Sequence, residues 1–268
     1  MSNLFDMSGR VAIVTGASRG LGQQFARALA RAGADLVLTS RDLERLADFR
    51  REVESLGRRA LAVELDVRQE ASIEAMARAA VEAYGRIDVL VNNAGLNIRK
   101  PALEYTWDEY DTILDTILKG SFFCARAVAR VMAPAGRGRI VNVGSATCAF
   151  GMDGIVPYTA SRGGIAQMTR GLAVEWGRYG ITVNCLAPGW FRTAQNSVLY
   201  ENAAWVASIT DRIPLGRPGQ PSDLDGTVVF LSSEASAYVT GQVLFVDGGF
   251  TTGATKAIVG TPPHPSRS

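Results

Sequence analysis

The sequence predicts an α/β fold: one doubly wound parallel sheet of about seven strands, with helices on both faces. Three observations predict this architecture. Short runs rich in Val, Ile and Leu alternate with longer amphipathic segments along the chain, and a glycine-rich turn directly follows the first run. The 268 residues, 47% of them hydrophobic and 20% charged, are also enough to bury one large core without disulfides or metals.

The strands are expected where short β-branched runs are bounded by turn residues. Such runs are short enough for strands and apolar enough to be buried on both faces of a sheet. They occupy residues 11–15, 36–39, 60–65, 87–91, 139–143, 181–186 and 243–246.

The helices are expected between these runs, where apolar residues recur every three or four positions. In the first such segment, Phe25, Ala28, Leu29 and Ala32 fall on one face. The six helical segments are residues 21–31, 43–56, 73–84, 107–132, 157–176 and 222–232. Strands alternating with helices in this way favour a parallel sheet.

No linker interrupts the pattern, so we expect one domain over residues 1–252. Residues 188–221 have weaker periodicity and several aromatic side chains. In a doubly wound sheet this segment would lie above the carboxyl ends of the strands, where ligands bind, and we expect a mobile substrate lid there. Residues 253–268 are rich in Pro, Ser and Thr and are expected to be a frayed C-terminal tail.

The charge balance excludes several classes of protein. Lys and Arg number 28 and Asp and Glu 26, a net charge of +2, which is unlike a basic nucleic-acid binder or a polybasic membrane binder. No apolar run approaches the roughly 18 residues of a membrane span, and residues 1–10 do not resemble a signal peptide. We therefore expect a soluble cytoplasmic protein without nucleic-acid or membrane partners.

Histidine and cysteine usage argues against metal chemistry. The single histidine, His264, lies in the Pro-rich tail, so His-based acid–base catalysis and most zinc sites are not expected. Cys124, Cys148 and Cys185 are far apart in the sequence and form no CxxC-type ligand pair. Their odd number also argues against a disulfide framework and for a reducing compartment.

The glycine-rich turn predicts a nucleotide site of the Rossmann type. Gly16, Gly20 and Gly22 have GxxxGxG spacing between the first strand and the first helix. Glycine allows the backbone to approach a pyrophosphate, and the helix N-terminus offers free N–H groups. A purely structural turn is the alternative, because glycine triplets alone are weak signals. The predicted contacts are Gly16, Ser18, Arg19, Gly20, Leu21 and Gly22.

The end of the second strand favours NADP(H) over NAD(H). An NAD site prefers a carboxylate there to bind the ribose hydroxyls. This sequence instead has Thr39-Ser40-Arg41, and Arg19 in the glycine loop supplies a second cation. Two guanidinium groups suit a ribose 2′-phosphate, although two solvated surface arginines are the simpler alternative.

Further motifs, in combination with the glycine loop, resemble the short-chain dehydrogenases/reductases. Asn92-Asn93-Ala94-Gly95 follows the fourth strand, Ser145 precedes Tyr158 by 13 positions, and Pro188-Gly189 is followed by Thr193. The resemblance extends over about residues 4–252. Residues 97–101 and 188–193 are most similar to the gluconate 5-dehydrogenase-type branch of that family.

The resemblance implies roles for individual residues. Tyr158 would be the proton donor or acceptor, and Ser145 would hold the substrate oxygen. A homo-oligomer, dimer or tetramer, would form through the helices of residues 107–132 and 157–176 and the last strand. The implied cofactor contacts, beyond the glycine loop and Arg41, are Asp66, Val67, Asn93, Ala94, Gly95, Tyr158, Arg162, Pro188, Gly189, Phe191 and Thr193.

Two positions depart from the family pattern. Arg162 stands where the family has a lysine four residues after the tyrosine, and Ile117 stands where it has an asparagine. Arg162 keeps the positive charge one helical turn from Tyr158 and can orient the ribose, so it is retained as a catalytic and cofactor-binding residue. A guanidinium does not readily lose a proton, and Ile117 supplies no amide, so a lysine–water relay would end at Arg162.

Two functions are compatible with these departures. The favoured one is an NADP(H)-dependent oxidoreductase that interconverts a small polar ketone and a secondary alcohol with an atypical proton relay. The alternative is a non-redox enzyme or a catalytically silent nucleotide-binding subunit on the same fold. Deliberate replacement of the two residues would also explain them.

The substrate would be a sugar acid or a hydroxyketone. Arg99 and Lys100 could meet an anionic substrate, although both could equally be solvated loop cations. Trp190, Phe191 and Trp205 would suit a bulkier ketone instead.

Overall fold

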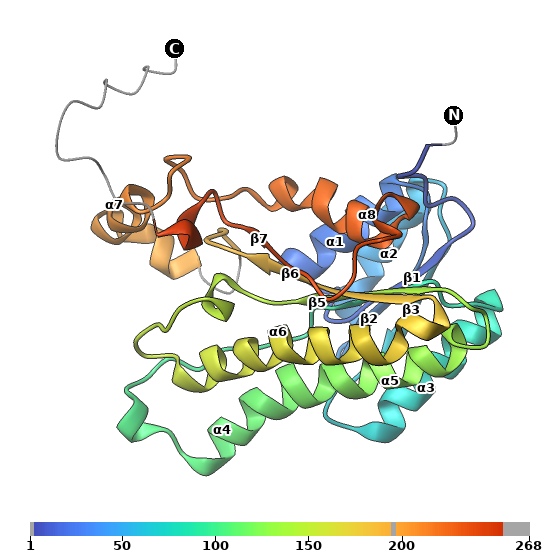
Figure 1. Cartoon of the computed structure of the whole chain (residues 1–268), viewed down its shortest axis with the longest axis horizontal. Helices are drawn as coiled ribbons and strands as arrows, with labels where there is room; N and C mark the ends of the chain where they lie inside the picture. The colour runs from blue at the N-terminus through green and yellow to red at the C-terminus, as the bar shows by residue number, and fades with distance from the viewer. Residues whose placement is uncertain (1–2, 194–196, 254–268) are drawn as a thin grey trace.

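The seven expected strands form one parallel sheet in the order β3-β2-β1-β4-β5-β6-β7, which confirms the predicted doubly wound fold (Figure 1). The computed structural model describes residues 3–193 and 197–253. The order reverses between β1 and β4, so a crevice opens there at the carboxyl ends of the strands. The strands are β1 Val11–Val14, β2 Asp35–Ser40, β3 Ala60–Glu64, β4 Val89–Asn92, β5 Gly138–Val143, β6 Ile181–Pro188 and β7 Val243–Val246.

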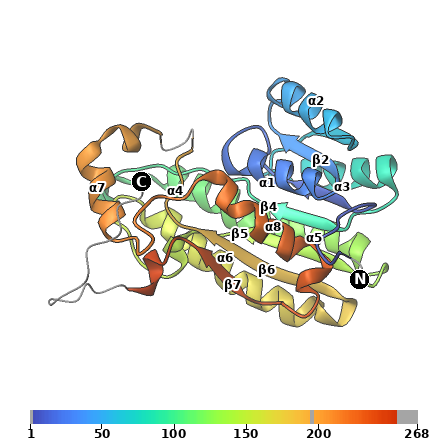
Figure 2. The same ribbon diagram turned by 90° about the horizontal axis from the view of Figure 1, so that it is seen from above.

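Helices cover both faces of the sheet. In Figure 1, α1, α2 and α8 lie above the sheet and α3, α5 and α6 lie below it. Figure 2 shows α1 and α8 side by side, where Gln24 donates to Asp225 at 2.7 Å. The helices are α1 Gly20–Arg31, α2 Ala47–Ser55, α3 Glu70–Tyr84, α4 Trp107–Leu114, α5 Gly120–Met132, α6 Val156–Trp176, α7 Ala203–Asp211 and α8 Asp225–Ser232.

The continuous apolar runs of the strands are explained by burial on both sides. Along β1, Ala12 and Val14 pack into the core under α1 and α8, whereas Val11 and Ile13 pack into the core over α3 and α5. Side chains on a strand alternate between faces, so a strand covered on both sides is apolar at every position.

A buried polar network joins the central strands to the helices beneath them. The Asn92 side chain donates to the Ser121 carbonyl and to Asn142 Oδ1, each at 3.0 Å. Asn142 in turn donates to Thr169 Oγ1 at 3.0 Å. This chain of hydrogen bonds fixes β4 and β5 against α5 and α6, immediately below the strand ends that carry the candidate site.

The single helix expected over residues 107–132 is interrupted. Thr106 starts α4 with a capping box, in which its hydroxyl accepts from Glu109 N–H and the Glu109 carboxylate accepts from Thr106 N–H. The turn Asp115–Lys119 is a π-helix, and α5 begins at Gly120. A π-turn carries one extra residue, which a count of apolar spacing does not reveal.

The segment expected as a lid contains a helix that periodicity did not predict. Helix α7 begins after Asn202, whose side chain accepts from Trp205 N–H. The Trp205 ring packs edge-on against Trp190 and Tyr200, with centroids 5.4 Å apart in each case. Residues 194–196 of this segment and residues 254–268 of the expected tail lie outside the described residues. Mobility of the lid stays a prediction.

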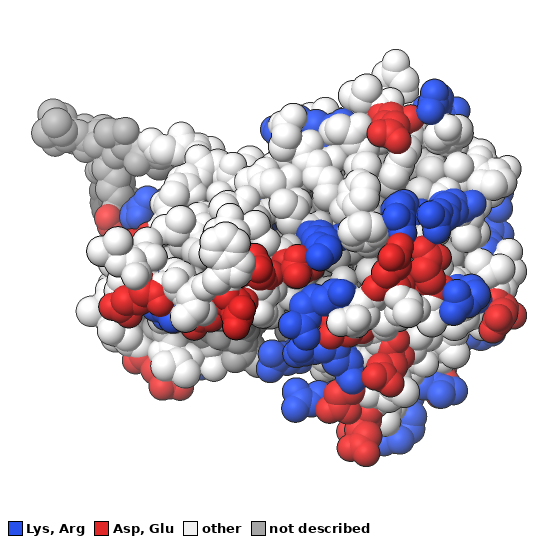
Figure 3. Space-filling model, turned by 90° about the horizontal axis from the view of Figure 1, so that it is seen from below, with Lys and Arg blue, Asp and Glu red and all other residues white. Residues whose placement is uncertain are grey.

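The described residues include no helix that is both long and apolar enough to cross a membrane. On the face seen in Figure 3, a group of basic side chains lies near the middle, and acidic side chains lie beside it and over the rest of the face. This agrees with the near-neutral charge of the sequence.

Candidate active site

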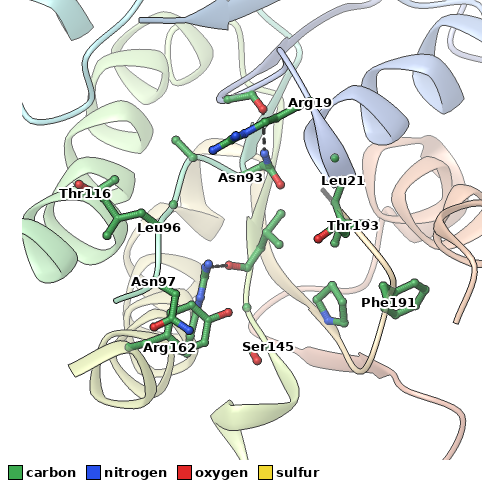
Figure 4. A pocket seen from close by; sticks show the side chains of 18 of the residues that line it. Arg19, Leu21, Asn93, Leu96, Asn97, Thr116, Ser145, Arg162, Phe191 and Thr193 are labelled. Carbon is green, nitrogen blue, oxygen red and sulfur yellow. Dashed lines mark hydrogen bonds between the residues drawn. The ribbon is translucent and has the colours of Figure 1, made fainter. Parts of the chain in front are cut away.

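A cavity of about 940 Å³ opens at the carboxyl ends of the central strands and brings together nearly every predicted site residue. Figure 4 shows Arg19, Leu21 and Asn93 toward one end of it and Ser145 and Arg162 toward the other. The predicted residues that line it are Gly16, Ser18, Arg19, Gly20, Leu21, Arg41, Asp66, Val67, Asn93, Ala94, Gly95, Ser145, Tyr158, Arg162, Pro188, Gly189, Phe191 and Thr193.

The glycine loop turns as its sequence predicts. Gly16 and Gly20 have φ values of +66° and +62°, a region that glycine enters at little cost. Gly22 is not among the residues that line the cavity. A Cβ there would lie 2.3 Å from the Gly16 carbonyl oxygen and 2.4 Å from Asn93 Nδ2, so Gly22 allows the loop to pack rather than facing a ligand.

Asn93 holds the glycine loop against β4. Its side chain donates to the carbonyls of Thr15 and Gly16 at 3.0 and 3.2 Å. The Thr15 hydroxyl accepts from the backbone N–H groups of Asn93 and Ala94, both at 2.9 Å. These bonds set the width of the crevice between β1 and β4.

Four arginines line the end of the cavity next to β2 and β3, and two of them form ion pairs with carboxylates. Arg45 pairs with Asp42 at 3.0 Å, and Arg68 pairs with Asp66 at 3.1 Å. Within the described residues, the side chains of Arg19 and Arg41 have no ion-pair or hydrogen-bond partner. The two guanidinium groups predicted to bind a phosphate are therefore the two that no other side chain of the described residues already binds.

Asp66 is held ionised beside this cluster. Burial alone would raise the pKa of its carboxyl group, but hydrogen bonds from Arg68 outweigh burial and keep that pKa below its usual value. Its backbone N–H is bonded to Ser72 Oγ at 3.1 Å. The carboxylate thus adds a fixed acceptor next to the arginines.

Ser145 and Tyr158 reach the cavity from two adjacent elements. Ser145 follows β5 in an extended conformation, and its hydroxyl accepts from Thr147 N–H at 3.2 Å. Tyr158 lies in the first turn of α6, which starts at Val156 with Pro157 in a position where proline needs no hydrogen bond. The hydroxyl and the phenol therefore line the same cavity.

Arg162 is buried below Tyr158. Its guanidinium carbon lies 4.9 Å from the centroid of the Tyr158 ring, a cation–π distance. Nη1 donates to the Val143 carbonyl at 2.5 Å, whereas Nε is buried without a protein partner in the described part of the chain. Only 7% of Arg162 is exposed, so its charge acts within the site.

Ile117 and Gly95 complete the surroundings of this guanidinium. A Cβ on Gly95 would lie 3.0 Å from Arg162 Nη2 and 3.5 Å from Ile117 Cγ1. Ile117 has no exposed surface. Arg162 and Ile117 therefore both lie close to Gly95, whose missing side chain leaves the guanidinium room on this side.

At the other end of the cavity, only some of the residues expected to contact the substrate line the wall. Arg99 lines the cavity, but Lys100 does not, because its ammonium group pairs with Glu109 at 2.6 Å. Trp190 lines it, whereas Trp205 packs behind Trp190. Sequence reasoning missed Asn97, whose Oδ1 is buried without a partner among the described residues.

Several other lining residues were also missed, and some left a signal in the sequence. Arg45 lies four residues after Arg41 in the segment that follows the second strand, and Arg68 closely follows the third strand. Phe150 and Met152 carry no such signal. Within residues 3–193 and 197–253 no cluster of His, Cys, Asp and Glu could hold a metal ion, and His264 lies outside that part.

Comparison with known proteins agrees with this geometry. The chain matches the family model described as enoyl-(acyl carrier protein) reductase over residues 16–251. Gluconate 5-dehydrogenase of Gluconobacter oxydans (strain 621H) is 44% identical over 251 residues, 93% of this chain and 97% of that protein. The 2-dehydro-3-deoxy-D-gluconate 5-dehydrogenase of Escherichia coli (strain K12) is 41% identical over 247 residues, 92% and 97% of the respective chains.

A solved structure is similar over almost the whole fold. The crystal structure of a gluconate 5-dehydrogenase from Burkholderia cenocepacia J2315 in complex with NADP and tartrate has a TM-score of 0.91 and 39% identity. The match covers 94% of this chain and 98% of that chain.

Proposed function

This chain belongs to the short-chain dehydrogenases/reductases, and we propose that it is an NADP(H)-dependent oxidoreductase interconverting a ketone and a secondary alcohol of a sugar acid. One observation carries the proposal. A single cavity joins a glycine loop, two unpaired arginines and the Ser145–Tyr158–Arg162 group. No other arrangement in the described residues combines a dinucleotide cradle with a proton-transfer group.

The residues present fit NADP(H). The N-terminus of α1 carries no side-chain cap, so its first N–H groups can donate to an anion. Arg19 and Arg41 would hold a 2′-phosphate, and the buried Nε of Arg162 would donate to a ribose hydroxyl. When bound, the cofactor would supply or accept the hydride. The Burkholderia relative, which contains NADP, supports this assignment.

Tyr158 and Ser145 would protonate and bind the oxygen of the substrate, respectively. Hydride addition leaves negative charge on a carbonyl oxygen, and the phenol of Tyr158 would give that oxygen its proton. Ser145 would hold the oxygen through its hydroxyl. The guanidinium of Arg162 lies beside the ring. In the direction of alcohol oxidation, Tyr158 would accept the proton of the substrate hydroxyl.

A sugar acid fits the far end of the cavity. Arg99 would pair with its carboxylate, and the unpartnered Oδ1 of Asn97 would accept from a hydroxyl. The relatives in Gluconobacter oxydans and Escherichia coli are both named for sugar-acid substrates.

The experiment that tests the function follows NADPH absorbance with 5-ketogluconate, a neutral sugar ketone and an enoyl thioester. We expect oxidation of NADPH with the ketoacid, slower oxidation with the neutral ketone, and formation of NADPH from NADP⁺ and gluconate. Tight NADPH binding without turnover of any substrate would contradict the proposal and favour a silent nucleotide-binding subunit. Turnover of the enoyl thioester alone would contradict the ketone assignment.

We propose further that protons reach Tyr158 without the lysine–water relay of the family. A guanidinium does not readily give up a proton, so Arg162 would not pass one on as a lysine does. Ile117 places hydrocarbon where the family has an amide. Tyr158 would therefore exchange its proton with solvent through the open cavity.

Restoring both family residues tests this proton path. The double variant Ile117→Asn/Arg162→Lys is expected to raise kcat by roughly threefold to tenfold, a small part of what acid–base catalysis contributes, and to change its pH profile. Each single variant, which restores only half of the relay, is expected to gain nothing. Steady-state rates across pH give the result, and NADPH titration with thermal melting verifies folding. An unchanged rate and pH profile in a folded double variant would contradict the proposed path.

A homo-oligomer, dimer or tetramer, is also proposed. Exposed apolar side chains gather on the helices that the family resemblance assigns to contacts, with Trp107 83% and Val174 87% exposed. Strand β7 is at the edge of the sheet, and Leu244 on it is exposed. Packing these surfaces against a second copy would remove apolar area from water.

A further inference from the structure

Two of the three cysteines meet directly behind the turn that carries Ser145. Cys185 lies on β6, and Cys148 ends the short 3₁₀ turn Ala146–Cys148. A Cβ on Gly144 would lie 2.6 Å from Cys185 Sγ and 3.0 Å from Cys148 Sγ. The two sulfur atoms therefore share the space that the missing side chain of Gly144 leaves.

The two thiols differ in environment. Cys148 is partly exposed, and its Sγ donates to the Arg162 carbonyl at 3.1 Å. The hydrogen bond from Cys185 lowers the pKa of the Cys148 thiol to about 7, and the charge of Arg162 acts in the same direction. Cys185 has no exposed surface, and its contact with Cys148 together with burial raises its pKa. Cys148 is thus the nucleophilic thiol and Cys185 the protonated partner.

We propose that Cys148 and Cys185 form an oxidation site for hydroperoxides, at which the two thiols close to a disulfide and slow turnover. The Cys148 thiolate attacks one oxygen of hydrogen peroxide, which breaks the O–O bond, leaves a sulfenic acid and releases hydroxide. The released hydroxide takes the Cys185 proton and becomes water, and the Cys185 thiolate attacks the Cys148 sulfur. The sulfenic oxygen leaves as hydroxide and becomes the second water with the proton that Cys148 lost on ionisation. Two thiols lose two electrons and two protons, and one peroxide becomes two waters.

The effect on turnover follows from the position of Cys148. Its backbone N–H bonds to the Ser145 carbonyl at 2.9 Å, and its Sγ bonds to the carbonyl of Arg162. A disulfide to β6 draws Sγ away from α6 and pulls on the turn that holds the Ser145 hydroxyl. The loss of rate rests on the proposed function, whereas formation of the disulfide does not.

The test treats the full-length protein with hydrogen peroxide and measures free thiols, intact mass, peptide connectivity and ketoacid turnover. We expect loss of two thiols, a Cys148–Cys185 cross-link, at least about a tenfold drop in kcat, and recovery with dithiothreitol. Cys124→Ser is the matched control and should behave as the wild type, because Cys124 is fully buried in α5 and burial raises its pKa to about 12.

Two variants separate the roles of the thiols. Cys148→Ser should resist peroxide, and Cys185→Ser should accumulate sulfenic acid at Cys148 without a cross-link. Retention of all thiols in the wild type, or a cross-link to Cys124, would overturn the site. The proposed effect on rate would be overturned if peroxide lowered the turnover of Cys148→Ser as much as that of the wild type, or if the cross-linked protein kept its full turnover. If no form turns over a ketoacid, thiol counts and mass still decide whether the disulfide forms.

Discussion

Replacing Tyr158 by phenylalanine is expected to lower kcat by roughly 10³-fold, within the range that a positioned acid–base group contributes. The phenol is the group in the cavity that can give a proton to the substrate oxygen, because a guanidinium such as that of Arg162 does not readily give up a proton and the only histidine lies in the tail. The ring itself stays, so its contact with the guanidinium and the packing of α6 are preserved. NADPH affinity is therefore expected to stay within about twofold of the wild type.

Stopped-flow measurement of single-turnover reduction, with NADPH titrated separately, separates these two effects. Tyr179→Phe removes the same hydroxyl from an exposed tyrosine after α6 and should leave the rate unchanged. A Tyr158→Phe protein that retains more than about a tenth of the wild-type rate would assign the proton to another group.

The second large effect concerns the choice of cofactor. Arg41→Asp is expected to weaken NADPH binding by about 30-fold or more, since charge-assisted hydrogen bonds are each worth roughly 1.5–3 kcal/mol. NADH lacks the 2′-phosphate, so its affinity should fall little or should rise, because a carboxylate at this position suits free ribose hydroxyls. The preference for NADPH over NADH should then be lost.

Fluorescence titration with both cofactors measures the change. Arg50→Asp is the control, because it alters the net charge equally from α2, where Arg50 pairs with Glu54 and does not line the cavity. If NADPH and NADH affinities fall by the same factor in Arg41→Asp, Arg41 does not contact the phosphate.

The conformation of the glycine loop, at one end of the cavity, could be predicted from sequence because its requirements are local. A positive φ at Gly16 and Gly20 and a strand-to-helix turn are properties of a few consecutive residues. The place of Arg41 beside the cavity could be predicted for the same reason, since Arg41 directly follows the end of β2.

The substrate end could not be predicted in the same way, because it depends on which partners each side chain meets. Lys100 and Arg99 are adjacent in sequence, yet Glu109, the N3 residue of the α4 capping box, takes the ammonium of Lys100. Asn97 begins the 97–101 motif, but that motif gave no role to its side chain. The meeting of Cys148 with Cys185 likewise needed the pairing of β5 with β6, which no spacing in the sequence encodes.

The π-turn at residues 115–119 puts the two halves of one long helix out of phase. An additional residue rotates the side chains on either side of it by roughly 100° relative to an uninterrupted α-helix. Before and within the turn, Ile113 and Ile117 point to the apolar cluster under the reacting groups, and after it Cys124 and Val128 point to the main core. An uninterrupted α-helix could bury only one of these two sets of side chains. Deletion of a single residue here would therefore remove either the first pair from the apolar cluster beneath the pocket or the second pair from the main core.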